Sequence, residues 1–187
     1  DDEGEVIMTD RKGDIRVRIK RSFRNAISSP FFLQRIHGET RIITTDDQGV
    51  VRALQKNGSV KTIRLGEPSA DHRFIYAPFS SNRESDYIFL FTDRLVAYDK
   101  DGKVAFESAL PFIPTDGPLV LSHASNHFLA VADSLTSSVL LFSPGSSEPA
   151  YTFRGRFTPL LLDLDQDLET EAVLVEEKQL NILRLQD

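Results

Sequence analysis

Hydrophobic residues cluster in short stretches along the whole chain, and the pattern is that of β-strands. Stretches such as 41–45, 87–92, 128–132 and 172–175 are rich in β-branched and aromatic residues and are bounded by Asp, Gly, Asn or Ser. No window of a dozen residues carries apolar side chains at helical spacing between capping residues, and the best candidate, 22–29, runs into Pro30. The pattern therefore predicts an all-β chain with almost no helix.

Glycines in predicted turns recur at a nearly constant distance. Gly13, Gly58, Gly102 and Gly145 each stand between two strand-like stretches and are separated by 45, 44 and 43 residues. Gly58 and Gly102 follow Asn and Asp, and such pairs suit a tight hairpin because Gly and Asn tolerate a positive φ. A period of this length predicts repeated units of four antiparallel strands.

The unit can be followed strand by strand. The third unit is predicted to hold strands at 73–79, 86–92, 95–99 and 103–108, and the second and fourth units have the same order. The first matches only two strands of a unit and the last only three. The predicted units span residues 1–29 (partial), 30–69, 70–114, 115–156 and 157–187 (partial) of one domain that covers residues 1–187.

A four-stranded sheet cannot bury both of its faces alone, so repeated units of this kind stack as the blades of a β-propeller. We expect a propeller or partial propeller of about four to five blades of 43–45 residues. The surplus strand at 6–9 indicates the C-terminal part of a larger propeller, with a small closed ring as the alternative. The chain begins at Asp1 and not at Met, which favours a processed protein or an excised domain.

Two segments carry a family resemblance. Residues 87–104 resemble the blade consensus of quinoprotein-like propellers, and residues 157–175 are similar to the final blade of propeller modules of Bacteroidetes envelope proteins and to the integrin-type repeat. The resemblance covers about residues 40–187 and implies a propeller located in the periplasm or at the outer envelope. The Trp motifs of quinone-binding blades are absent, since the chain has no Trp.

Charge and composition narrow the function classes. The net charge of −6 disfavours nonspecific nucleic-acid binding, and we expect no nucleic-acid partner. The chain has no Cys, which excludes disulfides, thiolate metal sites and Cys nucleophiles. No apolar stretch approaches the roughly 20 residues of a transmembrane helix.

An acidic segment near the C-terminus is the sharpest candidate for a site. Asp163, Asp165, Asp167 and Glu171 would converge if the segment curls, and carboxylate oxygens at this spacing suit Ca²⁺. The integrin-type loop has ligands at matching positions, although Leu168 stands where that family prefers Gly. The alternative is a solvated acidic loop between two strands. We expect no required cofactor, with Ca²⁺ as the candidate metal.

Other chemistry-bearing residues give weaker patterns. His123 and His127 have the spacing of zinc ligands on a helix, but they lie between strands and favour an ordinary polar loop. Arg16, Arg18 and Lys20 would share one strand face, either to bind an anionic partner or to keep an outer strand from pairing. No Ser stands in a nucleophile elbow and no glycine-rich phosphate loop occurs.

The sequence thus predicts a non-catalytic propeller scaffold that binds a protein or ligand in the bacterial envelope. One alternative is a fragment of a larger propeller enzyme or sensor whose site uses further blades. A second alternative is a calcium-stabilised adhesive module of integrin-like kind. An incomplete ring would expose an apolar blade face, and it therefore predicts a dimer.

Overall fold

The computed structural model describes residues 5–19, 23, 25–36, 38–80, 84–123, 126–167, 169–176 and 179–185. The chain folds as two compact units, residues 1–76 and 77–187, each of which contains more than one of the repeats described above. From here on, "first unit" and "second unit" mean these two. The expectation of one domain over residues 1–187 stays a prediction. The described residues contain no helix, so none of them forms a helical membrane span.

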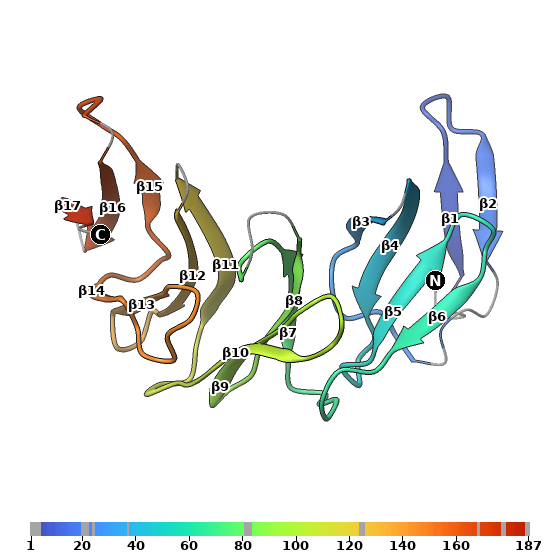
Figure 1. Cartoon of the computed structure of the whole chain (residues 1–187), viewed down its shortest axis with the longest axis horizontal. Coiled ribbons are helices and arrows are strands. Elements are labelled where there is room, and N and C mark those ends of the chain that lie inside the picture. Colours follow the sequence, from blue (N-terminus) through green and yellow to red (C-terminus); the bar gives the residue numbers. More distant parts are fainter. Residues whose placement is uncertain are drawn as a thin grey trace. The chain divides into compact units, whose positions relative to one another are not determined.

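The first unit is built from two antiparallel sheets (Figure 1). A two-stranded sheet pairs the first two strands of the chain, and a four-stranded sheet has its strands side by side in sequence order. The strands are β1 (Val6–Thr9), β2 (Ile15–Ile19), β3 (Phe32–Ile36), β4 (Glu39–Thr45), β5 (Val51–Gln55) and β6 (Val60–Ile63).

Strand β7 (Arg73–Ala77) holds the boundary of the two units, and the second unit contains the remaining strands. Two four-stranded sheets are ordered β10-β9-β8-β7 and β11-β12-β13-β14, and a three-stranded sheet is ordered β15-β16-β17. The strands are β8 (Asp86–Leu90), β9 (Arg94–Tyr98), β10 (Val104–Ala109), β11 (Asp116–His123), β12 (Asn126–Asp133), β13 (Ser138–Phe142), β14 (Tyr151–Arg154), β15 (Leu160–Leu162), β16 (Thr170–Glu176) and β17 (Gln179–Leu185).

The hairpin glycines lie where the repeat predicts them. Gly58 connects β5 to β6 with a φ of 85°, and Gly102 connects β9 to β10 with a φ of 80°. Each donates its backbone N–H three residues back, to the carbonyl of Gln55 and of Asp99 respectively. The left-handed backbone at these positions explains why both residues are glycine. The repeated four-stranded antiparallel sheets confirm the predicted all-β propeller fold.

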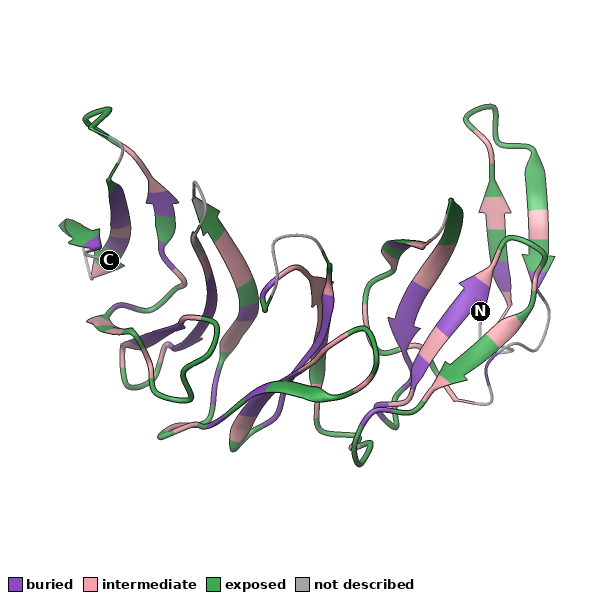
Figure 2. Ribbon diagram, in the orientation of Figure 1, coloured by how far each residue is buried: buried purple, intermediate pink, exposed green. Residues whose placement is uncertain are grey.

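Aliphatic and phenylalanine side chains fill the space between sheets. In the second unit, Phe106 of β10 lies edge-on to Phe79 with ring centroids 5.3 Å apart and to Phe142 of β13 with centroids 5.6 Å apart. Strand β8 is buried along its whole length (Figure 2). Phenylalanine thus supplies the inter-sheet packing of a chain without Trp, because large rings bury much apolar area.

A second cluster joins the last two sheets of the second unit. Ala172 and Leu174 of β16 pack with Leu141 of β13, and all three are almost completely buried. The packed side of the three-stranded sheet is therefore the side on which residues 172 and 174 lie.

Candidate functional site

The acidic segment forms the connection between β15 and β16. Gln166 has a positive φ of 62°, so the chain turns sharply in the middle of the segment. The carboxylate of Asp163 accepts a hydrogen bond of 3.2 Å from the backbone N–H of Asp167. Leu168, the departure from the integrin-type pattern, lies outside the described residues.

Three of the four predicted calcium ligands come together. Carboxylate oxygens of Asp163, Asp165 and Glu171 all lie within 4.8 Å of one another. Asp167 is not in this group, and its carboxylate instead lies 2.8 Å from Nη2 of Arg184. Asp163 and Glu171 stand at the two ends of the segment, and the turn at Gln166 brings these ends toward each other. Asp165 joins them from the middle of the segment.

Arg184 is a member of this site that the sequence analysis missed. Its guanidinium lies 3.0 Å from carboxylate oxygens of Asp165 and Glu169, and 3.6 Å from Oε1 of Glu171. Antiparallel pairing places Arg184 of β17 directly opposite Glu171 of β16. The hairpin register of the two last strands is the signal that could have revealed it.

Glu171 has an unusual environment within the cluster. Its side chain is 6% exposed. Oε2 accepts a hydrogen bond of 2.9 Å from the backbone N–H of Leu164, whereas Oε1 is buried and has no hydrogen-bond partner among the described residues. A buried carboxylate oxygen without a hydrogen-bond donor is costly, and Nε of Arg184 lies 3.6 Å from this atom.

The remaining electrostatics of the cluster follow from its charges. The backbone N–H of Glu169 chiefly lowers the pKa of Asp167, and Arg184 lowers it further. Asp167 first and Glu169 second raise the pKa of Arg184. One guanidinium thus contacts four carboxylates, and the site keeps an excess of negative charge.

The side of the β15-β16-β17 sheet that faces away from Ala172 and Leu174 exposes aliphatic side chains. Val173 lies opposite Leu160 on one side and Ile182 on the other, and Val175 lies opposite Leu180, so these five residues share one face. We call them the aliphatic face. Leu160, Val175, Leu180 and Ile182 are 64%, 50%, 63% and 52% exposed, and Figure 2 shows most of β17 in the exposed colour. An uncovered antiparallel face is normally polar, so this face is suited to a partner.

The size of the aliphatic face limits what it can hold alone. Strand spacings give it roughly 240 Å², against about 800 Å² that each partner buries in a stable interface. A partner that covers it must also contact neighbouring surface, such as the free edge of β17 or the acidic segment. Both lie next to the face, since β17 is the last strand of its sheet and Glu171 precedes Val173 by two residues on the same strand face.

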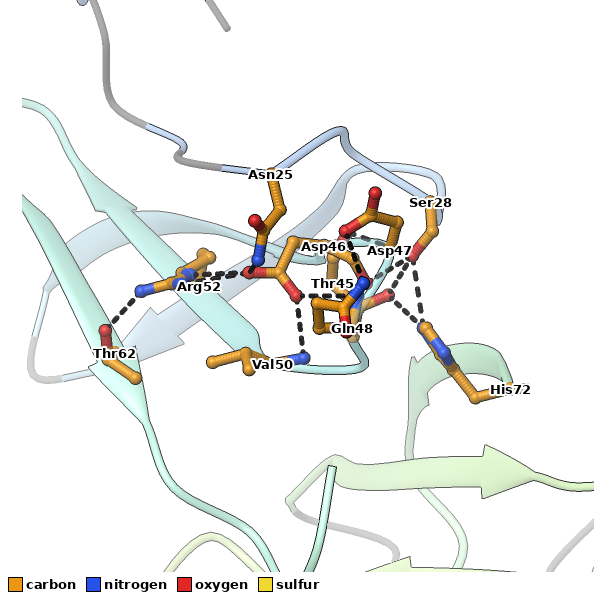
Figure 3. Close-up of polar contacts among 10 residues, drawn as sticks. All are labelled: Asn25, Ser28, Thr45, Asp46, Asp47, Gln48, Val50, Arg52, Thr62 and His72. Carbon is orange, nitrogen blue, oxygen red and sulfur yellow. Dashed lines mark hydrogen bonds and ion pairs between the residues drawn. The ribbon is translucent and has the colours of Figure 1, made fainter. Parts of the chain in front are cut away.

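A polar network in the first unit brings Ser28 and His72 together (Figure 3). Nε2 of His72 lies 3.1 Å from Oγ of Ser28 and 3.0 Å from Oγ1 of Thr45. The Ser28 hydroxyl donates its proton to the carbonyl of Asp46 in a hydrogen bond of 2.7 Å. The network thus links Ser28 to the end of β4 and to His72 through hydrogen bonds.

The weaker candidates of the sequence analysis are also placed. Nδ1 of His127 lies 2.7 Å from Oγ of Ser122, its cross-strand neighbour, while nothing is described for the side chain of His123. Arg16 pairs with Asp10, and Arg18 lies 3.4 Å from Glu5. Lys20 lies outside the described residues. The two described arginines thus have local acidic partners, as on a strand whose charges face solvent.

Comparison with known proteins identifies the fold. No protein-family model matches the chain, and no curated protein sequence matches it. Among solved structures, BamB from Moraxella catarrhalis is similar with a TM-score of 0.56 and 11% identity over 92% of this chain and 54% of that chain. BBS1N in complex with ARL6DN is similar with a TM-score of 0.56 and 11% identity over 88% of this chain and 56% of that chain. This chain therefore spans about half the length of the propellers it matches, and the likeness extends to the fold alone.

Proposed function

We propose that this chain is a non-catalytic β-propeller scaffold that binds a partner protein in the bacterial envelope. The aliphatic face of the β15-β16-β17 sheet carries the proposal. Its reverse side is packed against the preceding sheet, yet Leu160, Val175, Leu180 and Ile182 remain exposed together. Contiguous exposed aliphatic residues favour association with another surface. The envelope location is supported by the resemblance of residues 157–175 to propeller modules of envelope proteins.

A photo-crosslinking amino acid at position 180 tests the proposal. We expect it to capture a defined protein in cells of the source organism. The matched control is the same group at Leu135, which is 87% exposed but belongs to a turn away from the sheet faces. The captured protein, once purified, should bind the wild type and lose binding to Ile182→Lys, because a charge would then face an apolar partner surface. Equal capture from both positions, or unchanged binding by Ile182→Lys, would contradict the proposal.

The partner is either a different protein or a second copy of this chain. Sedimentation of purified residues 1–187 separates the two, and a dimer that Ile182→Lys converts to a monomer would identify the second copy. The aliphatic face alone is too small for a stable dimer, so a second copy would have to contact the β17 edge as well. A monomer at all concentrations leaves a different protein as the partner.

Calcium binding is the second candidate function, and the unsatisfied Oε1 of Glu171 favours it. Asp163, Asp165 and Glu171 offer hard oxygen ligands, which fit Ca²⁺. A bound ion would supply the cation that Oε1 lacks, and it would compete with Arg184 for Asp165. The residues of this chain would hold the ion between the two ends of the β15-to-β16 connection and would thereby fix that connection.

Thermal unfolding with added calcium tests this second function. The melting temperature should rise with calcium concentration, by the equivalent of about 2.7 kcal/mol at 100 times the Kd. Glu171→Gln should abolish the rise. Glu169→Gln is the matched control and should retain most of it, since Glu169 contacts Arg184 but is not among the converging carboxylates. An equal rise with magnesium, or none with millimolar calcium, would eliminate the calcium function.

A further inference from the structure

A pocket with a volume of about 310 Å³ lies in the first unit, beside the end of β6. The β4-to-β5 turn, the end of β6 and the segment after it form its walls. The main lining residues are Gly49, Val50, Ile63, Arg64, Leu65 and Pro68. Its volume is at the lower end of the range of ligand pockets, so it suits a short aliphatic group rather than a large ligand.

The wall at Gly49 is held by a close backbone approach. Gly49 has a φ of 79°, and a Cβ at this position would lie 2.5 Å from the carbonyl oxygen of Ser69. The turn and the 66–69 segment can approach this closely only because residue 49 is glycine. The N–H of Gly49 also donates to the carbonyl of Asp46 over 2.9 Å. The pocket is therefore formed before any ligand enters, which lowers the free-energy cost of binding.

Polar groups in the lining are already used within the protein. The N–H of Val50 donates to Oδ1 of Asp46 over 3.0 Å. The hydroxyl oxygen of Thr62 accepts from Nη1 of Arg52, a contact drawn in Figure 3. The N–H of Val50 and the hydroxyl oxygen of Thr62 are thus engaged within the protein, and Val50, Ile63 and Leu65 supply apolar residues to the lining.

Arg64 is the exception. It is exposed, it lines the pocket, and among the residues that the structure describes it has no hydrogen-bond or ion-pair partner. A guanidinium with free donors at the edge of an apolar pocket recognises an apolar group that bears a carboxylate. We propose that this pocket binds short aliphatic carboxylates, the chemistry shared by a small fatty acid and by the C-terminal residue of a peptide that ends in Val, Leu or Ile. This site is independent of the aliphatic face and of the acidic segment.

Titration of the ¹⁵N-labelled chain with hexanoate tests the proposal. Hexanoate should shift amide signals of residues 49–50 and 62–66 with a Kd of about 1 mM, and hexylammonium, which has the opposite charge, should leave them unchanged. Arg64→Gln should weaken hexanoate binding about tenfold or more, because a charge-assisted hydrogen bond is lost. Arg35→Gln, an exposed arginine of β3 outside the pocket lining, should bind as the wild type does.

Two peptides then distinguish the sources of the carboxylate. An acetylated tripeptide with a C-terminal Leu that binds tighter than both hexanoate and its own amide would identify a peptide end, whereas hexanoate tighter than both peptides would identify a fatty acid. Either result supports the proposal. It is overturned if hexanoate and hexylammonium bind equally, if neither shifts these residues at about 20 times the expected Kd, or if Arg64→Gln binds unchanged. Arg64 is exposed, so the variant keeps its fold, and its amide spectrum verifies this.

Discussion

Two aspartates of the first unit make the same local contacts and differ in burial, which makes them a sensitive test of what stabilises this fold. Asp10 and Asp46 each accept hydrogen bonds from the backbone N–H groups two and four residues later, and each contacts the arginine six residues later. Asp46 is completely buried, with Arg52 19% exposed, whereas Arg16 beside Asp10 is 66% exposed. The perturbation is Asp46→Ala, with Asp10→Ala as its control.

The expected loss follows from what the carboxylate of Asp46 satisfies. Oδ1 accepts from the N–H groups of Gln48 and Val50, and Oδ2 accepts from Nη2 of Arg52 over 2.9 Å. Removal leaves Nε and Nη2 of Arg52 and the backbone N–H of Val50 without their acceptor, in a site where the Arg52 side chain is only 19% exposed. Breaking a buried ion pair costs about 3–5 kcal/mol, so we expect a decrease of about 4 kcal/mol in the free energy of unfolding. Asp10→Ala should cost less than about half as much, because water replaces the lost contacts.

Native-state hydrogen exchange measures the effect where it occurs. Amides of β4 and β5 should lose protection in Asp46→Ala, while those of β12 and β13, which belong to the other compact unit, should change little because proteins open in local cooperative units. Asp10→Ala is the control, because it removes a turn carboxylate with the same hydrogen bonds from a more exposed site. Equal losses of protection in the two variants would refute the argument that burial of the pair sets its contribution.

Three further predictions concern the second unit. Phe142→Ala should lower its free energy of unfolding by about 3–5 kcal/mol in urea denaturation, since Phe142 is fully buried, whereas Phe157→Ala, which is 62% exposed, should change it by about 0.5 kcal/mol or less. The Thr136 hydroxyl, with backbone N–H groups, lowers the pKa of Asp133 below its ordinary value of 3.8. The ionised Asp133 therefore stabilises the fold above pH 3.8, and this contribution is lost as the pH falls through the lower pKa of the folded state. Asp133→Asn should reduce the loss of unfolding free energy at acid pH, and an unchanged loss would exclude Asp133 as its origin. Arg184→Gln should enlarge the melting-temperature rise with calcium, because the competing guanidinium is removed, and a smaller rise would indicate that Arg184 assists the ion.

Parts of the fold could be predicted from sequence because they depend on local chemistry. The spacing of Gly58 and Gly102 predicts the hairpins, since a left-handed turn residue is required wherever a tight antiparallel turn occurs. The acidic segment was recognisable for the same reason, because its carboxylates are close along the chain. Asp163, Asp165 and Glu171 do converge, although Asp167 turns to Arg184 instead.

Contacts between distant residues could not be predicted in this way. Arg184 could be placed at the cluster only by fixing the register of β16 with β17, and His72 reaches Ser28 across 44 positions of sequence. Neither residue stands in a motif that marks its partner. The aliphatic face was hidden as well, since Leu180 and Ile182 alternate along the strand in the same way as Leu183 and Leu185, and only packing decides that Leu185 is buried while Leu180 and Ile182 stay exposed.

The sequence by itself determined the strands, their hairpins and the repeated antiparallel sheet, because these follow from the alternation of side chains and from turn residues within a few positions of each other. Tertiary structure alone decided burial. The stretches that begin at Asp10 and Asp46 share their Asp, Gly and Arg at the same spacing, yet one pair is solvated and the other is enclosed. Solvent exposure depends on which sheets pack over a residue, and neighbouring sequence does not encode that.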